Sequence, residues 1–270
     1  MGQNGYSHDE ATTAQRFEAK YYISELEAEA IKDFMAPYVM PDHHTIGGKP
    51  YVINSLYLDN DALRLYWSSV LGEKNRFKLR IRSYTEDPND PVFFEIKRRV
   101  DRVILKQRAV MKRQAVDLLF DHREIPQEYF LKPIPKECKA FYDFRDIMES
   151  MHAGPRAMVR YTREAYMSNL EEPVRVTFDR ELTTLPCPEY HPDIWKHGPH
   201  WSTMDTVPVI LEVKFTDTFP EWIERMVYRF SLRRDSFAKY VVCLDGIKRE
   251  GMPLTWLHDP DEDIMWSRVE

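Results

Sequence analysis

Between Arg76 and Met111 the sequence alternates charged and apolar residues in three consecutive segments, residues 76–84, 92–97 and 103–110. Neighbouring side chains of a β-strand point to opposite faces. The first segment therefore places Lys78, Arg80 and Arg82 on one face and its apolar residues on the other. We expect three consecutive strands, each with a charged and an apolar face. For a single hairpin, this pattern is typical of an antiparallel sheet with one face in water.

The same alternation recurs in residues 16–22, 51–59, 157–166, 173–181 and 207–216. Eight strands can close into a barrel. If helices cover the apolar faces, the charged faces must line the lumen. The sequence therefore predicts an α+β fold, an eight-stranded antiparallel β-barrel with helices packed on its outside. We expect one domain over residues 14–247, a disordered N-terminus (1–13) and a C-terminal tail (248–270).

Helices are expected between the strands. Ser24 and Glu27 form a capping-box pattern at the start of the first helix. Gly72 should close the second helix, and Gly246 should stop the last one. Residues 183–205, rich in Pro, His and Trp, are predicted to form a long surface loop. The expected helices cover residues 24–41, 62–71, 112–122, 135–151, 218–232 and 235 or 236 to 244.

Composition limits the partners of this chain. It has 270 residues, 43% of them hydrophobic, and a formal net charge of −6, so its general surface does not favour nucleic acid or acidic membranes. The three cysteines are far apart and odd in number, so no disulfide framework is expected. No apolar leader precedes the first strand, and no stretch approaches 18 apolar residues. We expect a cytoplasmic protein without a transmembrane segment.

The charged faces predict a lumen that binds phosphate. Burying many like charges without a partner is prohibitive, so the lumen should hold water and counter-ions or a polyanion. Arginine and lysine both suit phosphate, and carboxylates together with substrate phosphates commonly hold Mg²⁺ or Mn²⁺. The expected cations are Arg16, Lys20, Lys78, Arg80, Arg82, Lys97, Lys106, Arg108, Arg163, Arg175, Lys214 and Lys239, and the expected carboxylates are Glu18, Glu95, Asp179 and Glu212.

Several short motifs occur in an order that resembles a known family. They are Arg16-Phe-Glu-Ala-Lys-Tyr-Tyr22, Arg80-Ile-Arg82, Phe94-Glu-Ile-Lys97, Lys106-Gln-Arg108, Tyr161-Thr-Arg163, Arg175-Val-Thr-Phe-Asp179, Ile210-Leu-Glu-Val-Lys214 and Phe237-Ala-Lys-Tyr240. Together they resemble the VTC domain, the polyphosphate polymerase branch of the triphosphate tunnel metalloenzymes. The resemblance spans Arg16 to about Gly246. It implies an eight-stranded tunnel, ATP as phosphoryl donor, Mn²⁺ or Mg²⁺ as cofactor and linear polyphosphate as product.

The resemblance also implies roles for single residues. Tyr161 matches a tunnel tyrosine, and Glu212 matches a metal-binding glutamate, with Glu18 and Glu95 as further candidate metal ligands. Further candidates for substrate binding are Arg16, Lys78, Arg108 and Lys214. One position departs from the pattern, because Ala238 stands where the family often has serine. The residues that match phosphate-binding cations of the family, and are expected to act in catalysis, are Lys20, Arg80, Arg82, Lys97, Lys106, Arg163, Arg175 and Lys239.

Two other functions remain open alongside the polymerase. The first is a tunnel hydrolase of triphosphate or nucleoside triphosphates. Such hydrolases open with Glu-x-Glu-x-Lys, whereas this chain has Arg16 at the first position and keeps only Glu18. The second is a non-catalytic sensor of polyphosphate, which Ala238 favours and Glu212 disfavours. The expected partners are ATP and polyphosphate or pyrophosphate, not nucleic acid, because few aromatics share the basic face. Whether a membrane protein receives the product stays open.

Overall fold

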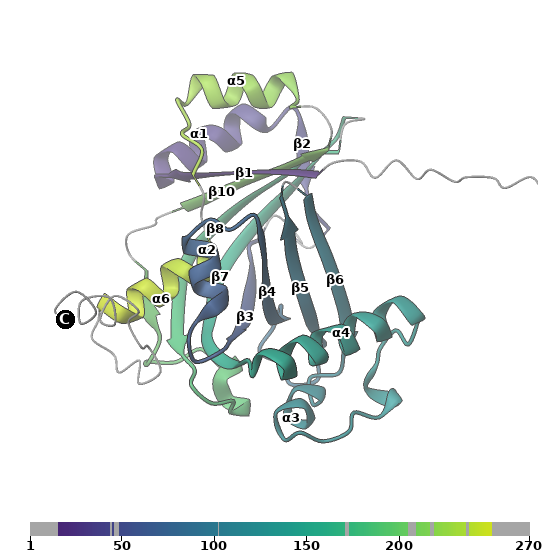
Figure 1. The fold of residues 1–270 in the computed structure, drawn as a ribbon. Coiled ribbons are helices and arrows are strands. Elements are labelled where there is room, and N and C mark those ends of the chain that lie inside the picture. The colour runs from purple at the N-terminus through teal and green to yellow at the C-terminus, as the bar shows by residue number, and fades with distance from the viewer. Residues whose placement is uncertain are drawn as a thin grey trace, which may run out of the picture.

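The computed structural model describes residues 16–43, 45, 49–101, 103–170, 173–204, 209–216, 219–235 and 238–249, and for Arg16 the backbone only. The strands in these residues form one strongly curved antiparallel sheet (Figure 1). Eight strands follow the order β1-β10-β8-β7-β3-β4-β5-β6, while β2 pairs with β7 and β9 pairs with β8. The strands are β1 (Arg16–Ile23), β2 (Val39–Pro41), β3 (Tyr51–Asp59), β4 (Asn75–Ser83), β5 (Val92–Val100), β6 (Val103–Met111), β7 (Gly154–Ser168), β8 (Arg175–Pro186), β9 (Ser202–Thr203) and β10 (Val209–Thr216).

The eight strands of the main path are the eight that the sequence predicts. Their register keeps the alternation, since Arg80 of β4 lies opposite Glu95 of β5, which lies opposite Arg108 of β6. The barrel itself does not close by hydrogen bonds, because β1 and β6 stand at the two ends of the strand order and the described residues show no pairing between them. The sheet instead curls, and the tunnel fold is formed by its concave face.

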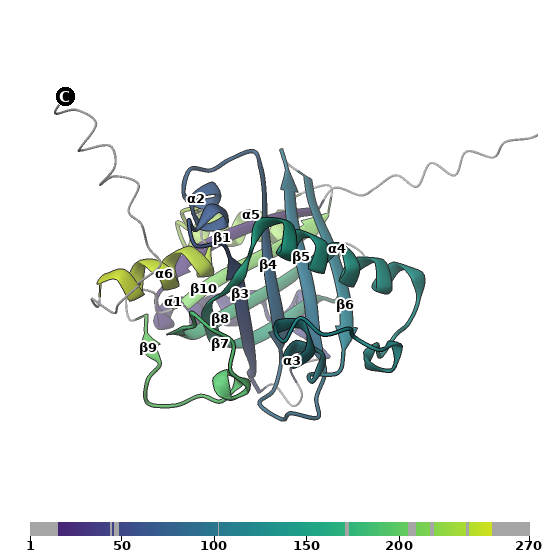
Figure 2. The same cartoon turned by 60° about the horizontal axis from the view of Figure 1, so that its bottom comes forward.

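Helices cover two parts of the convex face (Figures 1 and 2), and an apolar cluster lies under each part. One lies between β3–β6 and the helices α3 and α4, with Phe94 packed against Phe141 and Phe144. The other lies under α1 and α5, where Trp222 stacks on Tyr38. The helices are α1 (Glu25–Met35), α2 (Arg64–Val70), α3 (Ala115–Phe120), α4 (Pro135–Met151), α5 (Glu221–Arg229) and α6 (Lys239–Arg249).

Helix α6 departs from the expected arrangement, since it does not pack on the outside. Its Tyr240 and Leu244 belong to a third cluster with Val159 and Tyr161 of β7. Val159, Tyr161 and Arg163 share one face of the strand, and Tyr161 and Arg163 line the concave cavity. Helix α6 therefore covers one end of the concave face, next to α2 (Figure 2). This placement brings the first residue of the helix, Lys239, into the lumen.

The start of α1 and the end of α2 have the capping residues that the sequence predicts. Ser24 and Glu27 form the predicted capping box. Gly72 follows α2 with a φ of +66°, a conformation that glycine adopts without steric cost.

Three expected boundaries were wrong. The first helix ends at Met35, a turn follows, and Val39–Pro41 form β2 instead. Helix α6 continues past Gly246 to Arg249. At Gly246 the helix approaches Met204 so closely that an added Cβ would collide with the Met204 sulfur. Residues 183–204 do not form a simple surface loop, because they include the end of β8, strand β9 and the buried Trp195. Apolar side chains in this stretch reach the core.

Candidate functional site

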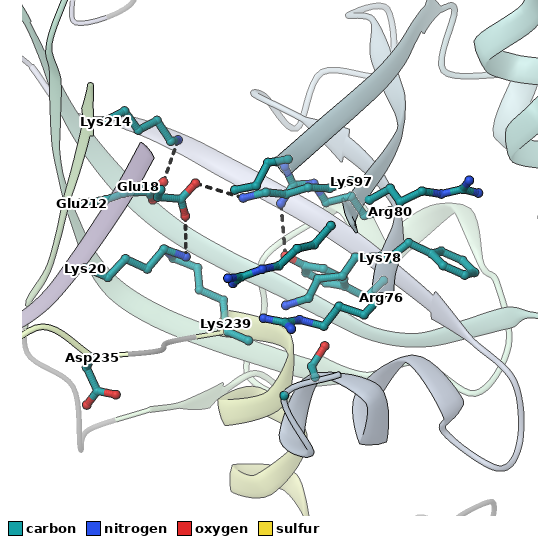
Figure 3. Close-up of a pocket in the computed structure, with 18 of the residues that line it drawn as sticks. Glu18, Lys20, Arg76, Lys78, Arg80, Lys97, Glu212, Lys214, Asp235 and Lys239 are labelled. Carbon is teal, nitrogen blue, oxygen red and sulfur yellow. Dashed lines mark hydrogen bonds and ion pairs between the residues drawn. The ribbon is translucent and has the colours of Figure 1, made fainter. Parts of the chain in front are cut away.

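The concave face of the sheet encloses a cavity of about 610 Å³ (Figure 3). Its wall comes from β1, β3–β7 and β10, from the end of α2 and from the start of α6. Residues that are distant in sequence therefore meet only because the sheet curls. The charged residues of the wall are Glu18, Lys20, Arg76, Lys78, Arg80, Arg82, Lys97, Arg98, Arg99, Arg163, Glu212, Lys214, Arg234, Asp235 and Lys239.

One ion pair joins the two halves of the curled sheet. Lys97 of β5 lies 3.0 Å from Glu18 of β1, from the opposite wall (Figure 3). Strand β1 is one end of the strand order, and β5 is next to the other end. The charged faces of both halves therefore point into the same lumen, as the alternation of the sequence predicts.

Glu18 and Glu212 form a carboxylate pair on neighbouring strands. Lys20 Nζ lies 2.8 Å from Glu18, and Lys214 Nζ lies 2.6 Å from Glu212. Burial alone would raise the pKa of Glu212, but Lys214, Lys20 and Arg163 hold that pKa well below its usual value. The two carboxylates also repel, since the charge of Glu212 acts to raise the pKa of Glu18. The pKa of each group is lowered, so both are ionised at neutral pH, and their side chains lie next to each other in the lumen (Figure 3).

Asp179 organises a second group of cations. Arg163 donates two hydrogen bonds to it, at 2.5 and 2.7 Å, and Lys239 Nζ lies 2.6 Å from its second oxygen. The Lys239 ammonium also lies 4.6 Å from the centre of the Tyr161 ring. Asp179 is buried. A buried carboxylate with bidentate contact to arginine fixes the orientation of the guanidinium, so Arg163 and Lys239 are held before any ligand arrives.

Glu95 holds cations rather than presenting a free carboxylate. One of its oxygens contacts Arg80 at 2.7 Å, and the other contacts Lys106 at 2.6 Å and Arg108 at 3.3 Å. Burial lowers the pKa of Lys106 to about 8, against the opposing effect of Glu95. The side chain of Glu95 is fully buried, and it does not line the cavity. Its position suits the orientation of Arg80 better than the binding of a metal ion.

Lys78 is the least compensated cation of the wall. Burial and the neighbouring cations, Lys20, Lys97 and Arg80 foremost, lower the pKa of Lys78 well below its usual value. Within the described ranges it has no ion-pair partner. Arg82, which is also buried, contacts the hydroxyls of Ser55 at 3.2 Å and Tyr161 at 3.5 Å. An anionic ligand beside Lys78 would offset the repulsion from the neighbouring cations.

Some expected site residues lie away from the cavity. Arg175 contacts Asp42 and the Tyr51 hydroxyl, and neither it nor Lys106 nor Arg108 belongs to the cavity wall. The side chain of Arg16 lies outside the described residues. The expected residues that the structure does bring together in the wall are Glu18, Lys20, Lys78, Arg80, Arg82, Lys97, Tyr161, Arg163, Glu212, Lys214 and Lys239.

The wall also contains residues that the motifs did not indicate. Tyr57 lies 3.3 Å from Arg80 and stacks on Tyr240, and Arg76 precedes Lys78 by two positions. The alternation of β4 already places Arg76 on the charged face, so it could have been found. Arg234 and Asp235 lie in an irregular segment beside β1, where the Asp235 amide donates to the Lys20 carbonyl. No local pattern indicates that segment, and only the tertiary structure identifies it.

The part of the chain that holds these site residues also matches a known protein family. A model of the VTC domain family matches residues 15–247, most of the chain. The chain belongs to the VTC domain family. The resemblance drawn from the ordered motifs is thereby confirmed. No curated protein matches the sequence significantly.

Two solved structures are similar to most of this chain. One is a putative adenylyl cyclase, HpAC1, from Hippeastrum, described as having a dominant triphosphatase activity, with 13% identity over 90% of this chain and 99% of that chain and a TM-score of 0.46. The other is the PH1819 protein from Pyrococcus horikoshii OT3, with 11% identity over 85% of this chain and 98% of that chain and a TM-score of 0.43.

In the described residues no helix is long and apolar enough to cross a bilayer.

Proposed function

We propose that this VTC-domain protein is a metal-dependent polyphosphate polymerase, which transfers the γ-phosphoryl group of ATP to the end of a linear polyphosphate chain. The observation that carries this proposal is the cavity wall, where cations from five strands and α6 face one lumen. The transferred group leaves the bridging oxygen of ADP and forms a new bond to a terminal phosphate oxygen of the chain. Phosphoryl transfer depends mainly on positioning and charge neutralisation, which a wall of this kind provides.

Glu18 and Glu212 fit one divalent cation. No cluster of three or more acidic, histidine or cysteine side chains occurs in the described part of the chain. Mg²⁺ and Mn²⁺ do not need such a cluster when one or two carboxylates and the substrate phosphates complete the coordination. The repulsion between these two carboxylates is the feature that a cation would relieve. Mg²⁺ or Mn²⁺ would neutralise charge on the transferred phosphoryl group.

The remaining wall residues would bind and orient phosphate. Arg80, held by Glu95 and Tyr57, and Arg163, held by Asp179, present guanidinium groups whose orientation is fixed in advance. Fixed donors lose little entropy when they bind phosphate oxygens. Lys78 has no such partner in the part of the chain that the structure describes, so it can follow a phosphate group that moves during the transfer.

The test is the product formed from ATP and Mn²⁺, separated by chain length on a gel. We expect ADP and a ladder of phosphate chains, stimulated by a short pyrophosphate primer because the primer replaces the slow first transfer. A reaction that gives only ADP and orthophosphate, with or without primer, would identify a hydrolase instead. Polyphosphate binding with no ADP formed would identify a sensor.

Arg80→Ala tests whether a cation of the cavity wall binds both ligands. It should weaken the binding of ATP and of polyphosphate together, since one guanidinium serves both ligands. The control is Arg225→Ala on the exposed surface of α5, where Arg225 forms an i,i+4 ion pair with Glu221. An equal loss in both variants would show that the effect is not specific to the lumen.

A further inference from the structure

Charge of opposite sign gathers on the cavity wall and in the residues that follow α6. Among the described residues, the wall has twelve lysines and arginines and three carboxylates. Residues 250–270, which lie outside the described residues, contain six carboxylates and one arginine. Four of these carboxylates stand within five positions, Asp259-Pro-Asp-Glu-Asp263, which we call the acidic run. The acidic run therefore complements the charge of the wall.

The part of the wall that is open to solvent contains arginines without acidic partners. Arg76 lies opposite Arg99 across β4 and β5, and they donate to the backbone carbonyls of Glu73 and Asp101. Neither arginine forms an ion pair with a carboxylate of the described residues. Burial and Arg99 lower the pKa of Arg76. The exposed residues that line the cavity are Val70, Gly72, Arg98, Arg99, Arg234 and Asp235, and we call them the cavity mouth.

The last turn of α6 lies close to the cavity mouth. The Lys248 ammonium lies 4.8 Å from the centre of the Tyr66 ring and 5.1 Å from the centre of the Trp67 ring, and both rings belong to α2. Val70 follows Trp67 by about one helical turn on the same helix and belongs to the cavity mouth. The chain therefore leaves α6 beside the cavity (Figure 2).

The acidic run is within reach of the cavity mouth. Asp259 follows Arg249, the last residue of α6, by ten positions. Ten residues span at most about 33 Å, whereas one turn of α2 is about 5 Å long. A group tethered by so short a segment has an effective concentration on the order of millimolar. Even a weak contact between the acidic run and the mouth would then be well populated.

Apolar residues stand beside both charged groups. Trp256 and Leu257 precede the acidic run. At the mouth, Val70 is 46% exposed, and Leu71, the next residue, is 72% exposed. Contact between these side chains would bury apolar area and place the acidic run next to the arginines.

We propose that the acidic run binds the cavity mouth of its own chain and competes with phosphate ligands for the lumen. Its carboxylates would occupy the place of phosphate oxygens on Arg76 and Arg99, since both arginines can bind either group. A carboxylate has two oxygens and one charge, fewer than a phosphate group of a chain. A long polyanion can therefore displace the acidic run.

This inference rests on the proposed function and adds regulation to it. The acidic run would lower the affinity of the lumen for short phosphate ligands. Because Arg99 is exposed, salt screens its contact with the acidic run. The competition should therefore be strongest at low ionic strength.

The experiment measures the affinity of the full chain for inorganic tripolyphosphate by titration calorimetry at low ionic strength. Divalent cations are left out, since the acidic run could bind them itself. The test variant is Asp261→Asn/Glu262→Gln. The control is Glu250→Gln/Glu270→Gln, which removes two charges from the same segment but none from the acidic run.

We expect the test variant to bind tripolyphosphate about 3-fold more tightly than the wild type. This is the gain when a contact with a Kd of about 1 mM, tethered at about 2 mM, is lost. The control should bind like the wild type, and added sodium chloride should reduce the difference. A synthetic peptide of residues 254–266 should weaken binding to the test variant, and the same peptide with the acidic run neutralised should not.

Each outcome decides between the inference and the function on which it rests. Wild-type affinity in the test variant, or an equal gain in the control, would overturn the inference and leave the phosphate tunnel standing. A gain that depends on protein concentration would assign the acidic run to a second copy and overturn the contact within one chain. If no variant binds tripolyphosphate, the proposed function fails together with the inference. Circular dichroism of each variant checks that the fold is intact.

Discussion

At the scale of single residues, carboxylates determine what the cations of the lumen can do. Asp179 and Glu95 are buried behind the wall, where they orient Arg163, Lys239 and Arg80. Glu18 and Glu212 instead line the cavity itself. Residues of the same type therefore divide into those that organise cations and those that are available to a metal ion. Access to the cavity, not residue type, separates the two groups.

Glu212→Gln tests the metal site. The change removes a cation ligand but no phosphate ligand, so turnover should fall about 100-fold or more while polyphosphate still binds. Binding should even tighten, because Lys214 and Arg163 lose a competing carboxylate. Product formation at saturating ATP and Mn²⁺ and polyphosphate affinity are both measured.

Glu221→Gln is the matched control, since Glu221 lies on the surface of α5. It should leave both quantities unchanged. Wild-type turnover in Glu212→Gln would show that the metal ion is bound by other groups.

The lowered pKa of Lys78 predicts that the binding of phosphate ligands depends on pH. Its pKa is depressed in the free protein by burial and by neighbouring cations, and bound phosphate would raise it again. Binding should therefore take up protons at pH values between the free and the bound pKa. Affinity should fall as the pH rises through that window.

Calorimetry in two buffers with different ionisation enthalpies measures the protons taken up. In Lys78→Arg the uptake should be smaller, because arginine does not lose its proton in this range. The same uptake in the variant and the wild type would assign the effect to another group, such as Lys97.

At the scale of elements, helix α6 connects the core to the lumen. The Tyr240 hydroxyl donates a hydrogen bond of 3.0 Å to Asp59, which also accepts from the amides of Leu65 and Tyr66 at the start of α2. One buried carboxylate thus anchors both helices that border the cavity. The next residue toward the lumen, Lys239, depends on this anchor for its position.

Tyr240→Phe should destabilise the protein by about 1.5–3 kcal/mol, the usual value for a hydrogen bond to a charged group. Urea unfolding measures this change. Tyr228→Phe is the control, because Tyr228 is 86% exposed on α5 and its hydroxyl is in water. Equal stability of the two variants would mean that the Asp59 contact contributes nothing.

At the scale of the whole molecule, a chain with a net charge of −6 gathers many of its lysines and arginines on the wall of one cavity. Helices cover the convex face (Figure 2), with apolar clusters beneath them, so anions reach the cations of the cavity wall through the lumen. Without a ligand these cations repel one another, as the pKa of Lys78 indicates. The free protein is therefore strained electrostatically in a way that a polyanion relieves.

Tripolyphosphate should raise the melting temperature. At 100 times its Kd a ligand adds about 2.7 kcal/mol, which corresponds to about 5–10 °C for a domain of this size. Thermal scans at matched ionic strength measure the shift, and sodium chloride alone should give little of it. An equal shift from the salt would indicate general screening, not a binding site.

The sequence by itself determined the strands and the faces that they present. A period of two in side-chain direction is local, so Lys78, Arg80 and Arg82 had to share a face whatever the fold. The ordered motifs also identified the family. Local rules placed the capping box of α1 and the glycine after α2 correctly for the same reason, since each depends on a few neighbouring residues.

Only the tertiary structure decided which charged residues meet. The sequence grouped Glu95 with Glu18 and Glu212 and placed Arg175 among the phosphate ligands, because residues on one face look equivalent along a strand. The curl of the sheet brings Glu18 to Lys97 and leaves Arg175 beside Asp42. It also directs α6 into the concave face, where helix packing overrides the stop expected at Gly246. Curvature and packing are sums over many distant contacts, and no short pattern in the chain encodes them.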